Sequence, residues 1–334
     1  MNSTSHRSIQ IIAPAAQRRQ ESDRSQLLAA IAEAYYIDGL GQADIAERFG
    51  CNRSAISRVL AEARAAGIVE IKVRREFSHD LQLSNQLTKL GGRTRVHVLR
   101  SSSLPDDAVS DLIASWAAQL VYSQLTDTSI LAVTLGTMVH RIARALALLP
   151  PINIDVVQMC GSVGSSELGL DGHATVRLLS SAYNCRSTFL HAPFLVENRE
   201  MLASLIRNAG NQECIDKCLR ATAAIVGLGT LDPKVSSLAR GGHVSLRVMS
   251  ALSERGAVGD VGGYMINERG ELVVSGEYIP VCAIEMDAFC RVPIRVGAAT
   301  GLSKGDIVAA AVRGGMLTDL VTDSETAMAA TKLL

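Results

Sequence analysis

The sequence predicts an α/β protein in two parts, an N-terminal winged helix-turn-helix domain and a larger C-terminal, doubly wound domain with a mostly parallel sheet. Two observations support this prediction. Residues 24–65 show three successive amphipathic helical patterns, and a strand-like alternation of apolar and charged residues follows at 68–73. Beyond residue 93, short apolar runs alternate with helical stretches, which is typical of a parallel sheet covered by helices on both faces.

Length and composition are those of a folded protein with two domains. The chain has 334 residues, of which 48% are hydrophobic, and it carries 33 basic and 33 acidic residues. The charge is unevenly distributed, because residues 1–75 contain eleven Lys or Arg against eight Asp or Glu. This basic excess coincides with the predicted helix-turn-helix.

Cysteine usage and the N-terminal segment indicate a cytoplasmic protein. Seven scattered cysteines do not make a disulfide framework, so a reducing compartment fits best. Cys214 and Cys218 have no second ligand pair nearby, so no metal site is expected, and no cofactor is expected either. Residues 1–23 lack the apolar run of a signal peptide or membrane span. They are predicted to form a flexible tail, and no membrane partner is expected.

Residues 24–75 are assigned to the winged helix-turn-helix domain. The first helix carries apolar residues at helical spacing and ends at Gly39. A short second helix at 42–49 is followed by a turn at Gly50, and Asn52 is a good N-cap for the third helix. Two short helices joined by a tight turn that contains glycine form a helix-turn-helix.

The third helix is the predicted recognition helix, because one face is apolar and the other carries short polar and arginine side chains. Side chains of these types reach base edges and phosphates in the major groove. The strand at 68–73 suggests a wing that lies along the DNA backbone. The alternative is an ordinary helical subdomain whose polar face is only solvated. The residues expected to contact double-stranded operator DNA are Gln42, Arg53, Ser54, Ser57, Arg58 and Lys72.

The rest of the chain is divided into a linker helix at 76–93 and an effector domain at 94–334. The linker helix is predicted from leucines at helical spacing that are followed by two glycines. Strands are expected at 95–99, 129–134, 152–158, 188–191, 223–227, 281–285 and 294–298. Ligands bind open parallel sheets at the carboxyl ends of the strands.

Two glycine-rich loops, 134–138 and 160–166, each follow a predicted strand and precede a predicted helix. Backbone N–H groups in such loops favour an anion, although a tight turn is the commoner meaning of either loop alone. Asp171 follows the second loop and either belongs to the same site or caps a helix. The candidate effector-binding residues in and after these loops are Thr134, Gly136, Thr137, Gly161, Ser162, Gly164 and Asp171.

Several sequence segments together carry a family resemblance. They are 35–42, 45–46, 54–60, 63–71 and the closing segment 314–323. With them, nearly the whole chain resembles the SorC/DeoR family of bacterial sugar-responsive regulators. Gly41 stands where the family usually has Ser, and glycine is only a slightly weaker N-cap.

The resemblance implies that the C-terminal domain is similar to sugar-phosphate isomerases and binds a sugar, a polyol or a phosphorylated derivative. Carried over by position, the pocket residues are Gly136, Thr137, Gly161 and Gly164 for phosphate, Asp260 for sugar hydroxyls and Lys304 for the anion. Met138 stands where relatives often have a hydroxyl residue, and Ser162 replaces a common Gly. A phosphate is therefore held less fully, or the ligand is unphosphorylated.

These observations predict a ligand-responsive repressor of a carbohydrate or polyol catabolic operon, acting as a homodimer or homotetramer on operator DNA. The competing hypothesis is a sugar-phosphate isomerase-like enzyme with an accessory DNA-binding domain. Lys304 is the only lysine placed at the site, and no His or Glu pair accompanies it, so no catalytic residue is expected. A purely structural DNA-bridging protein would not need anion-binding loops. The identity of the effector stays open, as does whether it induces or corepresses.

Overall fold

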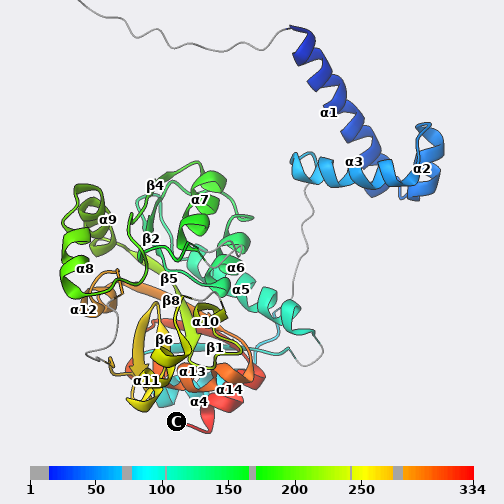
Figure 1. Ribbon diagram of the computed structural model, residues 1–334. Coiled ribbons are helices and arrows are strands. Elements are labelled where there is room, and N and C mark those ends of the chain that lie inside the picture. Colours follow the sequence, from blue (N-terminus) through cyan, green and yellow to red (C-terminus); the bar gives the residue numbers. More distant parts are fainter. Residues whose placement is uncertain (1–14, 70–76, 102–103, 165–170, 241–242, 274–280) are drawn as a thin grey trace, which may run out of the picture. The chain divides into compact units, whose positions relative to one another are not determined.

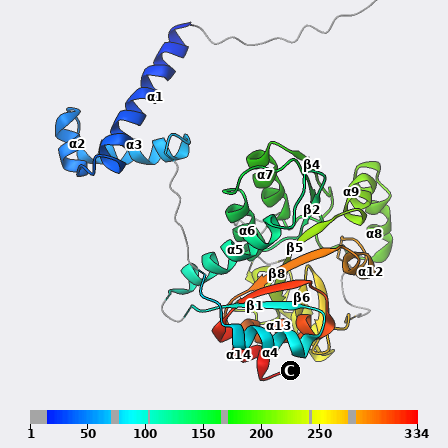
Figure 2. The same cartoon turned by 180° about the vertical axis from the view of Figure 1, so that it is seen from behind.

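The computed structural model describes residues 15–69, 77–101, 104–164, 171–240, 243–273 and 281–334 (Figures 1 and 2). Contacts between residues divide the chain into two units, 1–75 and 76–334. Each unit has its own buried apolar core, so each is described by itself. None of the described helices is long and apolar enough to span a membrane.

The first unit contains three helices around a small apolar core (Figure 1). Its helices are α1 (Ala15–Tyr36), α2 (Gln42–Arg48) and α3 (Arg53–Ala65). Ile45 of α2 and Ile56 of α3 are fully buried in the same core as Ile31 of α1. The side chain of Asn52 accepts a hydrogen bond from the backbone N–H of Ala55 at 2.8 Å, so it caps α3. These are the three helices and the N-cap that the sequence predicts.

The structure differs from the sequence-based expectation at the start of α1. The sequence predicts a flexible tail over residues 1–23, but residues 15–23 are helical. The segment consists mostly of Ala, Gln, Arg and Glu and contains neither Gly nor Pro, so its intrinsic helix propensity is high. The strand predicted at 68–73 falls largely within residues 70–76, which lie outside the described residues.

The second unit is built on a parallel sheet, as the sequence predicts. Within the described residues the strand order is β1-β9-β8-β5-β2-β3-β4. Because β3 and β4 extend to one side of β2 while β5, β8, β9 and β1 extend to the other, the strand order reverses between β2 and β5. The parallel strands are β1 (Arg95–Leu99), β2 (Ile130–Val133), β3 (Asp155–Gln158), β4 (Arg186–Thr188), β5 (Ala223–Thr230), β8 (Ile294–Ala299) and β9 (Asp319–Asp323).

Side chains alternate between the two faces of the sheet, and helices cover both faces (Figures 1 and 2). Leu131 and Val133 pack with the helices of one face, and Ala132 packs with those of the other. The first face is covered by α5 (Asp106–Tyr122), α6 (Thr137–Leu146) and α7 (Gly172–Tyr183). The second is covered by α4 (Leu81–Gly91), α9 (Ala209–Leu219), α13 (Gly305–Gly314) and α14 (Ser324–Thr331).

An antiparallel hairpin extends the far end of β5. It consists of β6 (Ala257–Val261), which pairs with the last residues of β5, and β7 (Tyr264–Asn267), which pairs with β6. The remaining described helices are short and lie in the connections: α8 (Arg199–Ile206), α10 (Ser237–Arg240), α11 (Leu246–Glu254), α12 (Met286–Cys290) and the 3-10 turn Leu302–Lys304.

Two expectations about this unit need correction or refinement. The strand predicted at 281–285 is wrong, because Val281 and Ala283 form only isolated bridges and α12 begins directly afterwards. The connecting helix is present as α4, but Leu87 is fully buried in the core of the second unit. α4 therefore packs as part of this unit.

A buried carboxylate ties β9 to β1 at the start of both strands. Asp319 is fully buried and accepts hydrogen bonds from Arg95 Nη2 at 2.9 Å and from His97 Nε2 at 3.1 Å. Burial by itself raises the pKa of Asp319, but hydrogen bonds from His97 and Arg95 outweigh it and hold the pKa below its usual value. The ionised form is therefore the one that stabilises the fold.

We predict that Asp319→Asn lowers the free energy of unfolding of the second unit by about 1–3 kcal/mol near neutral pH, since hydrogen bonds to a charged acceptor are lost. Because the folded-state pKa is depressed, this contribution is present above the unfolded pKa of about 4 and is lost as the pH falls through the folded value. Urea unfolding at neutral and acidic pH measures the difference. The exposed Asp127→Asn is the control, and an equal effect of both variants at neutral pH would contradict the prediction.

Candidate functional site

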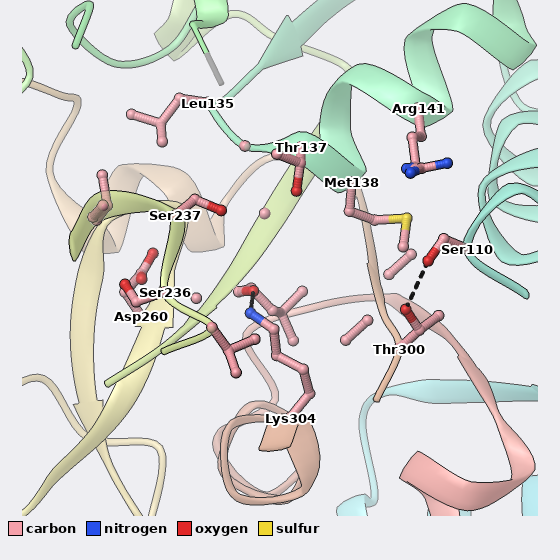
Figure 3. A pocket seen from close by; sticks show the side chains of 18 of the residues that line it. Ser110, Leu135, Thr137, Met138, Arg141, Ser236, Ser237, Asp260, Thr300 and Lys304 are labelled. Carbon is pink, nitrogen blue, oxygen red and sulfur yellow. Dashed lines mark hydrogen bonds between the residues drawn. The ribbon is translucent and has the colours of Figure 1, made fainter. Parts of the chain in front are cut away.

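A pocket of about 450 Å³ lies at the carboxyl ends of β2, β5 and β8 (Figure 3). This position is where the strand order of the sheet reverses, so the loops after β2 and β5 diverge and leave space between them. The hairpin of β6 and β7, the start of α10 and the 3-10 turn before α13 supply the remaining walls.

The start of α6 forms one wall of the pocket. Gly136 is its N-cap and has φ 133°, a conformation that L side chains rarely adopt. Thr137 and Met138 follow and both line the pocket (Figure 3). The first N–H groups of a helix have no partner within the helix, and the helix dipole makes this end positive. Arg141 lies one turn further along the same face and also lines the pocket.

Asp260 and Lys304 form the opposite wall. Asp260 accepts a hydrogen bond from the backbone N–H of Gly263 at 2.9 Å, and Lys304 Nζ donates to the carbonyl of Leu228 at 2.7 Å. Burial raises the pKa of Asp260, while the Gly263 hydrogen bond and the charge of Lys304 oppose this rise. Burial likewise lowers the pKa of Lys304, and Asp260 opposes this. Each group thus helps to keep the other charged.

Glycine at position 229 is required for Asp260 to occupy this place. The two residues are paired across β5 and β6, and a Cβ added to Gly229 would lie 1.7 Å from Asp260 Oδ1. Any larger residue at 229 would displace the carboxylate. The absence of a side chain at Gly229 therefore determines where the Asp260 carboxylate lies in this wall of the pocket.

The charge of the lining favours an anionic ligand. Arg141, Lys234, Arg240 and Lys304 supply four cationic side chains, whereas Asp107 and Asp260 are the acidic ones. Hydroxyl groups complete the lining, and they belong to Ser110, Thr137, Ser236, Ser237 and Thr300 (Figure 3). Such a lining can bind a small polar molecule that carries both hydroxyls and negative charge. The described lining residues include no histidine, cysteine or glutamate.

The structure brings four of the sequence-predicted effector residues together in this pocket: Gly136, Thr137, Asp260 and Lys304. Thr134 is completely buried beneath it and does not line it. Its Oγ1 accepts a hydrogen bond from the backbone N–H of Gly227 at 3.0 Å. Thr134 therefore supports the floor of the pocket.

The second glycine-rich loop is not brought into the described lining of this pocket. The N–H of Gly161 donates to the carbonyl of Cys282 at 2.8 Å, and the N–H of Ser162 donates to Ala192 at 2.9 Å. These donors are already occupied by backbone carbonyls. Gly164 is exposed, and residues 165–170 lie outside the described residues. Asp171 caps α7, because its side chain accepts from the N–H of His173 at 3.1 Å.

Several lining residues did not emerge from the sequence. Arg141 can be predicted from the sequence, since it lies four residues after Thr137 and so on the same face of one helix. Thr300 directly follows β8 and could have been inferred from the same strand-end rule as Thr137. Ser110 belongs to α5, and Ser236 and Ser237 belong to the connection after β5, so only the three-dimensional fold places them here.

The predicted DNA-contacting residues of α3 lie on its solvent-exposed face. Arg53, Ser54, Ser57 and Arg58 are all exposed, whereas Ile56 and other apolar residues of this helix are buried. Gln42 is the first residue of α2 and is partly exposed. Lys72 lies outside the described residues. An ion pair between Arg24 of α1 and Glu62 of α3 (Arg24 Nε to Glu62 Oε1, 3.0 Å) links the two helices.

The fold and the pocket define a class of protein in which an α/β ligand-binding domain follows a small helical unit. Residues 75–331 match the family described as "Putative sugar-binding domain". The chain is 30% identical over 307 residues to the transcriptional regulator LsrR of Enterobacter sp. (strain 638), a match that covers 91% of this chain and 92% of that protein. It is 29% identical over 309 residues to LsrR of Escherichia coli (strain K12), covering 90% and 93%.

Solved structures show the same fold. The full-length sorbitol operon regulator SorC from Klebsiella pneumoniae superimposes with a TM-score of 0.69 at 23% identity, over 92% of this chain and 98% of that one. The chain therefore belongs to the SorC/DeoR family of sugar-responsive transcriptional regulators. The family expected from the sequence is confirmed. Because its relatives are regulators, the protein is a transcriptional regulator and not an isomerase-like enzyme.

We predict that Gly229→Ala distorts the pocket wall. The new Cβ would overlap Asp260 Oδ1, and forcing an extra methyl group into a packed site costs about 1–3 kcal/mol. Thermal unfolding should therefore show a lower midpoint for this variant. The matched control is Gly210→Ala in α9, whose Cβ would find its nearest neighbour 3.6 Å away. Unchanged stability of Gly229→Ala would contradict the tight packing described for this wall.

Proposed function

We propose that this regulator is a cytoplasmic repressor of a carbohydrate or polyol catabolic operon. Its first unit is proposed to be a winged helix-turn-helix that binds operator DNA, and the pocket beside β2 and β5 is proposed to bind the effector. The observation that carries the proposal is the pocket itself, whose lining combines an excess of cationic side chains with a helix N-terminus and several hydroxyl groups.

The effector is proposed to be a sugar, a polyol or a phosphorylated derivative of one. The start of α6 and Arg141 suit a phosphate group, because they offer N–H donors and a guanidinium on one side of the pocket. Asp260 suits hydroxyl groups, which can donate to its carboxylate. Lys304 lies beside Asp260 and suits an anionic or hydroxyl oxygen. Thr134, Gly161, Ser162 and Asp171 make structural hydrogen bonds outside the described lining, and Gly164 is exposed.

The helix α3 is proposed to read the major groove. Its exposed face carries Arg53, Ser54, Ser57 and Arg58, while its opposite face packs on α1 and α2. Gln42 and Lys72 are proposed to contact the backbone of the DNA on either side of it. A single helix reads few base pairs, so two or four copies of the chain are proposed to act together on paired half-sites.

We predict that Arg58→Ala weakens operator binding by about 1–3 kcal/mol, since an arginine that contacts a base edge or phosphate is lost. The measurement is a gel shift with a DNA fragment that the wild-type protein selects from random sequence, at fixed salt concentration. Arg207→Ala, an exposed arginine at the end of α8, is the matched control. Undiminished binding by a folded Arg58→Ala protein would contradict the assignment of α3.

A second prediction concerns the effector. A ligand that binds only the folded protein raises its melting temperature, so sugars, polyols and their phosphates can be screened by thermal shift. The strongest stabiliser is expected to be a phosphorylated compound, and Lys304→Met is expected to remove its effect. Lys89→Met changes an exposed lysine of α4 and should retain it. Stabilisation that survives Lys304→Met would place the effector elsewhere.

A further inference from the structure

Residues 77–80, the first residues of the second unit that the structure describes, are bonded to the edge of the sheet. We call them the linker anchor, and the residues just before them the linker. The N–H of Asp80 donates to the carbonyl of Val98 at 2.8 Å, and the N–H of Arg100 donates to the carbonyl of Ser78 at 2.8 Å. These bonds pair the anchor with β1, the edge strand of the described sheet. The anchor therefore fixes where the chain leaves this domain toward the first unit.

One side chain of α5 holds the linker anchor from the side. The ring of Trp116 lies 5.0 Å from the ring of Phe77 and 4.6 Å from that of His79, edge to face with the latter. Contacts of this geometry between aromatic rings are favourable. The Nε1 of Trp116 is buried and, within the described residues, has no hydrogen-bond acceptor. A buried donor without an acceptor destabilises the arrangement that contains it, which favours any alternative position that supplies one.

The other end of the same helix lines the effector pocket. Asp107 and Ser110 are lining residues, and the hydroxyl of Ser110 lies 3.2 Å from that of Thr300 (Figure 3). Arg141 of α6 bonds to Asp107 at 2.7 Å and to Asp111 at 2.6 Å. About 14 Å of continuous helix separates Asp107 from Trp116. One rigid element thus contacts both the pocket and the linker anchor.

We propose that α5 couples the pocket to the linker, with Trp116 as the positioning residue at the linker anchor and Arg141 as the side chain that senses an anion. The proposal rests on the pocket being the effector site, as proposed above. A bound anion attracts Arg141 and weakens its ion pairs with Asp107 and Asp111. The N-terminal end of α5 is then held less firmly, the helix shifts, and Trp116 releases Phe77 and His79. Because the chain enters this unit from the first unit at the linker anchor, its release couples the effector to the DNA binding proposed for the first unit.

The first experiment uses the fact that Trp116 is the only tryptophan of the chain. Inorganic phosphate is titrated into the full-length protein while tryptophan emission is recorded, with sodium chloride of equal ionic strength as the control. Calorimetry measures phosphate binding separately. We expect phosphate, but not chloride, to shift the emission to longer wavelength. Arg141→Gln is expected to show the shifted emission without phosphate.

The outcomes of this titration separate the two proposals. Phosphate that binds by calorimetry without changing the emission overturns the coupling and leaves the pocket standing. The absence of phosphate binding overturns the anion site, and with it the coupling that rests on that site.

The second experiment changes Trp116 itself. Hydrogen exchange of the Asp80 amide, which donates to Val98, reports whether the linker anchor is in place. Phosphate is expected to accelerate this exchange at least about fivefold, the lower end of ordinary allosteric coupling. Trp116→Leu is expected to exchange rapidly with or without phosphate. Trp116→Phe keeps an aromatic ring but lacks the unpartnered N–H, so it is expected to exchange more slowly than the wild type without phosphate and still to respond to phosphate.

Phosphate affinity distinguishes coupling from simple damage. Because coupling is reciprocal, a variant that has already released the linker anchor should bind phosphate more tightly by a similar factor. Trp116→Leu is therefore expected to bind phosphate more strongly than the wild type. Unchanged or weaker phosphate binding by Trp116→Leu overturns the proposal. If that variant does not fold, a Trp116→Phe protein with no phosphate-dependent exchange at Asp80 would overturn it equally.

Discussion

The contact between Thr134 and Gly227 holds together the two strands between which the sheet reverses its order. The N–H of Thr134 donates to Ile225, and its hydroxyl accepts from the N–H of Gly227. This approach is possible only because residue 227 has no Cβ, which would lie 2.7 Å from the carbonyl of Leu135. The carbonyl of Gly227 in turn accepts from Gly262, at the turn of the β6–β7 hairpin. The hydrogen bonds of Gly227 to Thr134 and Gly262 thus position the wall that contains Asp260 next to the strands between which the pocket lies.

The pocket contains two charged groups, Asp260 and Lys304, whose pKa values burial shifts toward the neutral forms. Asp260 and Lys304 each oppose the effect of burial on the pKa of the other, so removing one would leave the other poorly stabilised. Asp319, at the opposite end of the sheet, is also a buried carboxylate, but it is stabilised by hydrogen bonds from Arg95 and His97. Asp319 lies away from the pocket, whereas Asp260 and Lys304 line the pocket that is proposed to bind the effector.

The sequence predicts what depends on neighbours along the chain. The three helices of the first unit, the Asn52 cap and the Gly136 loop all follow from local spacing, and each is present. The sequence predicts less well those features of the site that depend on contacts between segments far apart in the chain. The loop at Gly161 has the composition of an anion site, yet its N–H is bonded to Cys282, more than a hundred residues further along. The strand β9 is not predicted from the sequence, because a buried carboxylate occupies each end of it and leaves only three residues without charge.

The coupling proposed above acts at the boundary between the two units of the chain. Phe77 is the first residue of the second unit that the structure describes. Its ring contacts Trp116, which lies on the helix that also reaches the pocket. An ion pair that a ligand can compete for is a weaker link than a packed core, because it is partly exposed to solvent. That weakness suits a sensor, since a small molecule supplies only enough differential binding energy to shift a balanced equilibrium.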